Sequence, residues 1–276
     1  MMGKLAGKIA FITGGARGMG REYALRFAEE GAAIVITDIA KDVPTVAYEM
    51  AKQSELAQTV DEIKKHGVDA LGLVADVRNA QELELAVQKT IEHFGKIDIL
   101  VTNAGILSYN KLWEMSEQQW DEMLDICLKG TWLTCKYVLP HMIDRQAGKI
   151  LCVSSVNGLR GGQNVGHYVA AKHGVLGLVK TLAMEVGPYN IHVNAICPTA
   201  VDTTMANNQA TYDRLANKKG ATREEATPAF GNHHVFPHQD FIAPKDVINA
   251  ALFLVSDDSN NISGSHIAVD AGYLTM

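Results

Sequence analysis

Ser155, Tyr168 and Lys172 are the residues whose types and spacing could perform chemistry. The sequence "YVAAK" at 168–172 is expected to be helical, so the phenol and the ammonium, four residues apart, face the same side. A phenol with a pKa of about 10 is a poor acid or base at neutral pH unless a nearby charge favours its anion. Lys172 would supply that charge, and Ser155 would hold the reacting oxygen by a hydrogen bond. The trio therefore predicts proton transfer to or from an alcohol or carbonyl oxygen as hydride moves to or from a nicotinamide.

A second Tyr–Lys pair with the same spacing lies at 48–52, in "YEMAK". The residue thirteen positions before Tyr168 is Ser155, at the end of a predicted strand, whereas the corresponding residue before Tyr48 is Val35, inside one. Tyr48 also falls in a segment that we expect to be a loop insertion. We therefore predict no catalytic role for this pair.

A glycine-rich turn after the first predicted strand is a candidate dinucleotide site. In "TGGARGMG", Gly14, Gly18 and Gly20 stand where backbone must approach a ligand closely. The spacing differs from the common dinucleotide fingerprint, and a plain tight turn is the alternative. Its position favours a pyrophosphate site, because Asp38 follows about twenty residues on, where an acid binds ribose. A carboxylate there repels a 2′-phosphate, so NAD is preferred over NADP, although Arg17 leaves some room for NADP.

Two further strand ends add candidate cofactor contacts, since ligands of open α/β sheets bind beyond the carboxyl ends of the strands. Asp76 could accept from an adenine amine, and Asn103, Ala104 and Gly105 would let the backbone pass close to a ribose. Each of these, taken alone, is as readily a capping residue or a turn.

The elements that must position these residues alternate along the chain. Short apolar or β-branched runs alternate with longer helical stretches, which predicts parallel strands joined by helical crossovers. The fold class is α/β, a single Rossmann-type doubly wound parallel sheet over 1–276 with helices on both faces. The seven strands are expected at 8–13, 33–38, 70–75, 98–103, 149–155, 192–197 and 266–270. An insertion near 40–54 and a substrate lid near 200–243 exceed minimal crossovers.

Composition excludes several classes of function. The 276 residues are 47% hydrophobic and 20% charged, with a net charge of -6 and no long Lys/Arg run, which argues against nucleic acid or membrane as partners. The four cysteines form no Cys-x-x-Cys pair and predict reduced thiols. No secretory signal and no membrane span are recognised. We therefore expect a cytoplasmic protein that binds small molecules.

Other conspicuous side chains are given structural roles. His233, His234 and His238 could be metal ligands, but their loop context favours pocket-lining or surface residues, so we predict no metal site. His167 is expected to point away from the site of Tyr168. Trp113, Trp120 and Trp132 are expected in the core or in subunit contacts.

Taken together, "TGGARGMG", "NAG", Ser155 and "YVAAK" resemble the short-chain dehydrogenase/reductase family over the whole chain, through "ISGSHIAVDAGY". The resemblance implies a nicotinamide cofactor, a Ser-Tyr-Lys catalytic core and a homotetramer. The segment after Asp38 and "CPTAVDTTM" are similar to the carveol dehydrogenase-like, mycofactocin-associated subfamily. That similarity implies an NAD held tightly under the insertion and an apolar cyclic secondary alcohol as substrate. It also implies contacts to the cofactor from Thr199 and Thr203.

The resulting set of candidate cofactor-binding residues is Gly14, Arg17, Gly18, Met19, Gly20, Asp38, Ile39, Asp76, Val77, Asn103, Ala104, Gly105, Tyr168, Lys172, Pro198, Thr199, Val201 and Thr203.

Cys127 departs from the family pattern. Relatives usually place an asparagine at this position, where it helps to hold a water that relays protons to the lysine. We do not expect a cysteine to replace the hydrogen bonds of the amide. If the role depends on the backbone carbonyl, the relay survives; if it depends on the side chain, turnover should drop or use another route. We count Cys127 with the catalytic residues on this basis.

The leading prediction is an NAD-dependent dehydrogenase of a bulky, apolar, terpenoid- or steroid-like secondary alcohol or ketone. One alternative is a 3-oxoacyl-thioester reductase, which should favour NADP and place basic residues near the pocket mouth. Another is a sensor or scaffold that binds NAD without turnover. The presence of Ser155, Tyr168 and Lys172 together argues against a binding module, which does not need all three.

Overall fold

A single parallel sheet of seven strands organises the chain, in the order β3-β2-β1-β4-β5-β6-β7. The structure is a computed structural model that describes residues 3–231, 234–236 and 240–276. Its strands are β1 Ile9–Thr13, β2 Ala33–Asp38, β3 Ala70–Val74, β4 Ile99–Thr102, β5 Gly148–Val153, β6 Ile191–Pro198 and β7 His266–Val269. The predicted fold class is confirmed, and every predicted strand begins and ends within two residues of the observed one.

The chain order of the strands reverses beside β1. This strand pairs in parallel with β2 on one side and β4 on the other, with Phe11 opposite Val35 and Leu100. A parallel sheet covered on both faces buries nearly every strand residue, which explains the continuous apolar runs of β1 and β4. Ligands of such sheets bind at the reversal point, beyond the carboxyl ends of the strands.

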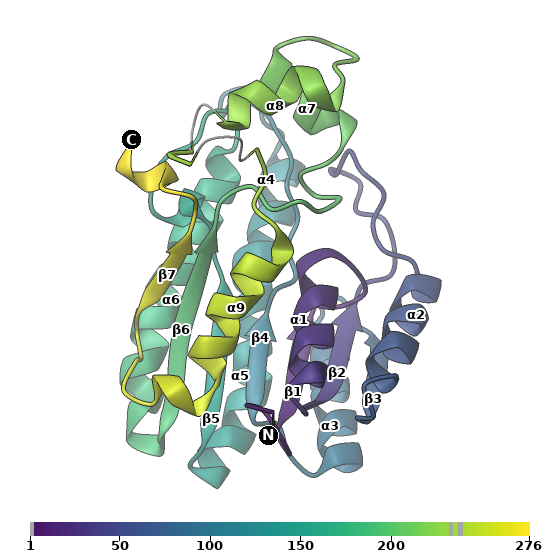
Figure 1. Ribbon diagram of the computed structural model, residues 1–276, viewed down its shortest axis with the longest axis vertical. Coiled ribbons are helices and arrows are strands. Elements are labelled where there is room, and N and C mark those ends of the chain that lie inside the picture. Colours follow the sequence, from purple (N-terminus) through teal and green to yellow (C-terminus); the bar gives the residue numbers. More distant parts are fainter. Residues whose placement is uncertain (1–2, 232–233, 237–239) are drawn as a thin grey trace.

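Helices cover both faces of the sheet (Figure 1). On one face, α1 Gly18–Glu29, α2 Gln53–Lys64 and α9 Pro244–Val255 share a buried core with the sheet. On the other, α3 Ala80–Phe94, α5 Gly130–Arg145 and α6 Gly166–Val186 form a second core. The helix α4 Glu117–Leu124 runs into α5 through a π-helical turn at Asp125–Lys129.

The two long segments differ in structure. Residues 39–52 form neither helix nor strand before α2 begins at Gln53. Within 200–243, the chain forms α7 Gln209–Ala216 and α8 Arg223–Gly231, which lie beyond the carboxyl ends of the strands, at the top of Figure 1. The sequence did not reveal these two helices.

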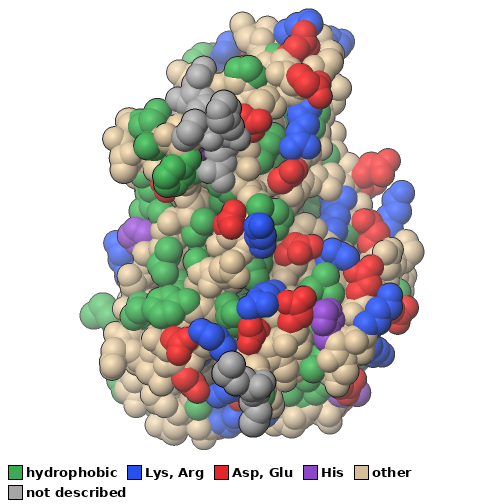
Figure 2. All heavy atoms as spheres, in the orientation of Figure 1, with side chains coloured by type: hydrophobic (Ala, Val, Ile, Leu, Met, Phe, Trp, Pro, Cys, Tyr) green, Lys and Arg blue, Asp and Glu red, His purple; other side chains and the backbone are tan. Residues whose placement is uncertain are grey.

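The surface carries mixed charges. On the face in Figure 2, Lys and Arg side chains lie interspersed with Asp and Glu. Ion pairs of the protein include Lys4–Asp258 and Arg26–Glu30. Within the described ranges, no helix is both long and apolar enough to cross a membrane.

Candidate active site

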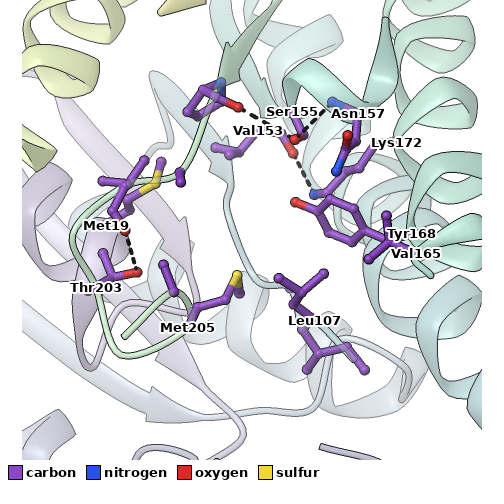
Figure 3. Close-up of a pocket in the computed structure, with 18 of the residues that line it drawn as sticks. Met19, Leu107, Val153, Ser155, Asn157, Val165, Tyr168, Lys172, Thr203 and Met205 are labelled. Atoms are coloured by element: carbon purple, nitrogen blue, oxygen red, sulfur yellow. Dashed lines mark hydrogen bonds between the residues drawn. The ribbon is translucent and has the colours of Figure 1, made fainter. Parts of the chain in front are cut away.

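Ser155, Tyr168 and Lys172 come together at the carboxyl end of β5 (Figure 3). Ser155 ends the strand region, and its Oγ accepts a hydrogen bond from the Asn157 backbone N–H (3.1 Å) and donates to the Pro198 carbonyl (3.5 Å). Tyr168 and Lys172 lie on the first two turns of α6. The sequence predicted this grouping, because residues four apart on a helix share a face.

The ammonium of Lys172 is held at the ring of Tyr168. Its Nζ donates to the Val153 carbonyl of β5 at 2.8 Å and lies 5.5 Å from the centre of the Tyr168 ring. Burial raises the pKa of the Tyr168 phenol well above its usual value, whereas a hydrogen bond with Ser155 opposes that rise. The phenol is therefore protonated at neutral pH, which is the form that can donate a proton to a carbonyl oxygen.

The glycine-rich turn between β1 and α1 leaves no space for a side chain at Gly14, Gly15 or Gly20. A Cβ on Gly20 would stand 1.9 Å from the Gly14 carbonyl oxygen, and Gly14 itself has φ +66°. The Asn103 amide donates to the carbonyls of Thr13 (3.0 Å) and Gly14 (3.1 Å) and so fixes the turn to the end of β4. Asn103 thus has a bracing role that its sequence position did not show. The arrangement fits a dinucleotide phosphate lying against the start of α1.

Asp38 ends β2 with its carboxylate held by backbone. One oxygen accepts from the Ala16 N–H (3.1 Å) and the other from the Ala40 N–H (3.3 Å). Burial raises the pKa of this carboxyl, while these hydrogen bonds and the charge of Arg17 oppose the shift. The position is the one expected for a ribose-binding acid.

Asp76 has a partner that the sequence did not predict. Its carboxylate forms an ion pair with Arg78 at 2.6 Å, and Lys41 lies 3.9 Å away. Although burial raises the pKa of Asp76, the hydrogen bonds and charge of Arg78 hold it below its usual value. Asp76 is therefore ionised beside the cavity at neutral pH.

A cavity of about 890 Å³ joins the glycine turn to Tyr168. The predicted residues that line it are Gly14, Arg17, Gly18, Met19, Asp38, Ile39, Asp76, Val77, Asn103, Ala104, Gly105, Ser155, Tyr168, Lys172, Pro198, Thr199, Val201 and Thr203. Gly20 and Cys127 are not among the lining residues. Segments far apart in sequence thus converge on one cavity. Leu107 and Met205 lie across it from the Tyr168 phenol (Figure 3).

Cys127 lies behind the cavity, on the π-helical turn, and makes contacts that we did not expect of a thiol. Its Sγ lies 3.5 Å from the Ile106 N–H and 3.6 Å from the Ile106 carbonyl, so it acts as both acceptor and donor to one residue. Hydrogen bonds of sulfur are weak, and the expectation that this thiol does not replace those of an amide stays a prediction. The Cys127 carbonyl accepts from the Thr131 hydroxyl at 3.0 Å.

Tyr48 lies at the cavity, which the sequence did not predict, while its lack of a catalytic role stays a prediction. It lines the same cavity, and its hydroxyl accepts a hydrogen bond from the Leu107 N–H at 3.2 Å. Lys52 is instead the exposed N-cap of α2, so the two do not act as a pair. The local pattern gave no signal for Tyr48, because a loop residue is placed by tertiary contacts.

The histidines that the sequence analysis considered lie in different places. His234 is buried and lines the cavity, whereas His233 and His238 lie outside the described residues. Across the described part of the chain, no three His, Cys, Asp or Glu residues gather as metal ligands. His167 is buried and bonds the Ser108 hydroxyl at 2.8 Å, away from the cavity lining.

The three tryptophans are not core residues. Trp113, Trp120 and Trp132 are exposed and do not line the cavity. The prediction of a core position was therefore wrong, and a role in subunit contacts stays a prediction. All four cysteines are free and buried, as the sequence predicted.

Comparison with known proteins agrees with this geometry. A family model described as enoyl-(acyl carrier protein) reductase matches residues 14–274. The chain is 39% identical to (-)-trans-carveol dehydrogenase of Rhodococcus erythropolis, over 98% of this chain and 99% of the relative. It is 34% identical to a 3-oxoacyl-[acyl-carrier-protein] reductase of Thermotoga maritima, over 98% of each.

A solved structure matches equally well. The crystal structure of carveol dehydrogenase from Mycobacterium avium in complex with NAD superposes with a TM-score of 0.97 at 39% identity, covering 99% of this chain and 100% of that one. The fold, the extent of these matches and the grouped residues agree. The chain is an oxidoreductase and belongs to the short-chain dehydrogenase/reductase family.

Proposed function

We propose that the protein is an NAD-dependent dehydrogenase of bulky, apolar, cyclic secondary alcohols and the corresponding ketones. The observation that carries this proposal is the grouping of Ser155, Tyr168 and Lys172 at one end of a cavity whose other end holds the glycine turn and Asp38. The relatives named for carveol support the cyclic substrate. Apolar residues such as Leu107, Val156 and Met205 in the lining suit an apolar ring.

Bound NAD would supply the carbon that accepts or gives the hydride. The chain's own residues then handle the proton: Ser155 orients the substrate oxygen, and Tyr168 gives a proton to it in reduction or takes one in oxidation. Lys172 lies where its charge favours the phenolate. Gly14, with no side chain, lets the turn lie close against Ala104, whose Cα a Cβ would approach to 2.9 Å, and Asp38 would accept from a ribose hydroxyl.

The insertion after β2 supports a tightly held NAD. Hydrogen bonds tie it to the body: Arg17 donates to the Glu49 carbonyl, the Leu107 N–H donates to Tyr48, and the hydroxyl and N–H of Thr45 both donate to the Glu122 carboxylate. These contacts draw residues 42–50 over the cavity that Arg17 and Tyr48 line. NAD under this cover would be released slowly.

The test is a screen of cyclic secondary alcohols and ketones, including terpenols and hydroxysteroids, with NAD and an artificial electron acceptor both present. The acceptor allows turnover even when the cofactor cannot leave. Turnover that vanishes in Tyr168→Phe supports the proposal. Turnover with NADP alone, or undiminished turnover in that variant, contradicts it.

A 3-oxoacyl-thioester reductase is the second candidate, and two observations favour it: the 34% identity to such an enzyme, and the basic Arg160 and Arg214 in the cavity lining. The two differ in cofactor and substrate, because the carboxylate of Asp38 disfavours NADP. The same screen with 3-oxoacyl thioesters and NADPH separates them. A protein that only senses or binds NAD, without turnover, does not require Ser155, Tyr168 and Lys172 together.

We also propose the organisation of the chain: one domain over 1–276, an insertion near 40–54 and a substrate lid near 200–243. Lining residues from α7 and from the segment before it support the lid.

We propose a cytoplasmic homotetramer without nucleic-acid or membrane partners, for which the exposed Trp132 on α5 offers a subunit contact. Light scattering of the purified protein tests the assembly.

A further inference from the structure

The substrate end of the cavity carries positive charge without a balancing carboxylate. Arg160 and Arg214 both line it. The acidic lining residues are Asp38 and Asp76, which end or follow strands on the cofactor side, and Asp76 already pairs with Arg78. Arg160 is exposed, whereas Arg214 is half-buried, and a charged group withdrawn from bulk water is costly unless it is paired.

Of the two arginines, Arg214 is the better positioned to bind an anion inside the cavity. It lies in the last turn of α7, half-buried, with its guanidinium carbon 4.7 Å from the centre of the Tyr109 ring. Its Nε is buried and has no hydrogen-bond partner among the residues that the structure describes. Across the described ranges it forms no ion pair, and the remaining positions of the sequence include no Asp or Glu.

The Tyr109 ring connects Arg214 to the reacting end of the cavity. The Tyr109 hydroxyl bonds the Thr211 hydroxyl at 3.0 Å, one turn before Arg214 on α7. Tyr109 also lies near enough to Tyr168 to disfavour its anion. Arg214 is thus placed toward the phenol and not at the glycine turn, where the cofactor phosphates would lie.

We propose that Arg214 binds an anionic group of the substrate, a carboxylate, while the carbinol carbon lies at Tyr168. This inference rests on the proposed dehydrogenase function and narrows its substrate class to apolar cyclic hydroxy acids and keto acids. A guanidinium offers planar paired donors that match a carboxylate, and the stack on Tyr109 fixes its plane. Arg160, exposed and 4.7 Å from the Tyr273 ring, adds positive potential at the mouth.

The test compares matched substrates and matched variants. The substrates are 4-hydroxycyclohexanecarboxylate, its methyl ester and 4-methylcyclohexanol, with a cholanoic hydroxysteroid acid and its ester as a larger pair. The variants are Arg214→Gln and, as control, Arg223→Gln. Arg223 comes from the same segment and also stacks on an aromatic ring, Phe241, but it pairs with Asp202 at 3.2 Å and does not line the cavity.

The wild type should prefer each acid over its ester. Arg214→Gln should raise KM for the acid by ~30-fold, as expected for loss of a charge-assisted hydrogen bond, and should change KM for the ester less than ~3-fold. The dissociation constant for NAD should not change, and Arg223→Gln should behave as wild type. A wild-type preference for the esters, or equal losses on acid and ester in Arg214→Gln, would overturn the inference.

A binding measurement separates this inference from the proposed function. Calorimetry of the NAD-loaded protein with cyclohexanecarboxylate needs no turnover. If no alcohol or ketone reacts but cyclohexanecarboxylate binds to wild type and not to Arg214→Gln, the anion site stands and the dehydrogenase proposal fails. If wild type turns over neutral alcohols but does not bind the carboxylate, the anion site fails alone. Binding of a 3-hydroxyacyl-coenzyme A, measured in the same way, shows whether Arg214 binds a phosphate instead of a carboxylate. If Arg214→Gln weakens the binding of this thioester but not that of cyclohexanecarboxylate, the carboxylate assignment is overturned.

Discussion

The Nζ of Lys172 lies 5.5 Å from the centre of the Tyr168 ring, tethered at 2.8 Å to the carbonyl of Val153. The carbonyl at the end of β5 therefore fixes the charge beside the phenol before any substrate arrives. A lysine held in this way stabilises the phenolate more than a mobile lysine would, because the charge is oriented in advance in a site of low polarity. The chemistry depends on the junction of one strand with one helix.

The first prediction concerns the proton donor. Tyr168→Phe should lower kcat by ~10²–10⁴-fold, the usual contribution of a general acid or base. Binding of NAD should change little, because the ring remains and only the hydroxyl is lost. Steady-state kinetics and NAD titration check both statements. Tyr189→Phe, at an exposed tyrosine, serves as the control.

The second prediction concerns pH. Burial raises the pKa of Tyr168, and oxidation of an alcohol needs its anion, so kcat/KM for oxidation should rise from about pH 6 toward pH 10. Reduction of a ketone needs the protonated phenol, so it should stay nearly constant over this interval and fall only above about pH 10. Lys172→Met should move both profiles to higher pH, because the charge that favours the anion is gone. Profiles that coincide for the two proteins would show that Lys172 does not act on the phenol.

The sequence predicted the residues that local geometry places and missed those that tertiary contacts place. Seven strands followed from apolar runs, and Tyr168 with Lys172 from helical spacing. Tyr48 reaches the cavity from an irregular loop, and Arg214 reaches it from a short helix. Neither the helical nor the strand periodicity of apolar residues in the sequence indicates that these two side chains line a cavity. The contacts of the Cys127 thiol depend on a π-helical turn that sequence patterns do not specify.

The third prediction concerns cofactor choice. Asp38→Ser removes the carboxylate that would repel a 2′-phosphate and should raise the ratio of NADP to NAD efficiency by ~100-fold. Burial raises the pKa of Asp38, so the affinity of wild type for NAD should fall on acidification at a higher pH than an exposed carboxyl would require. NAD binding measured against pH in wild type and variant tests this, since the variant should lose the dependence.

The fourth prediction concerns the insertion. Tyr48→Phe removes the acceptor of the Leu107 N–H and should speed NAD release by ~10-fold, as expected for loss of one buried hydrogen bond. Stopped-flow displacement of bound NAD measures the rate. Thr45→Val, which removes the hydroxyl bond to Glu122 and leaves the bond from the Thr45 N–H, should act in the same direction with a smaller effect. An unchanged rate in both variants would show that the insertion does not retain the cofactor.

The fifth prediction concerns Cys127, whose sulfur bonds both the N–H and the carbonyl of Ile106. Cys127→Asn offers the same two hydrogen bonds through a stronger donor and acceptor, so activity should stay intact or rise. Cys127→Ala offers neither and leaves a small void, so the free energy of unfolding should fall by about 1–2 kcal/mol, with a lower kcat. Denaturant unfolding and steady-state kinetics of the two variants decide the matter. A large loss of activity in Cys127→Asn would mean that the thiol, and not its hydrogen-bonding positions, is what the site requires.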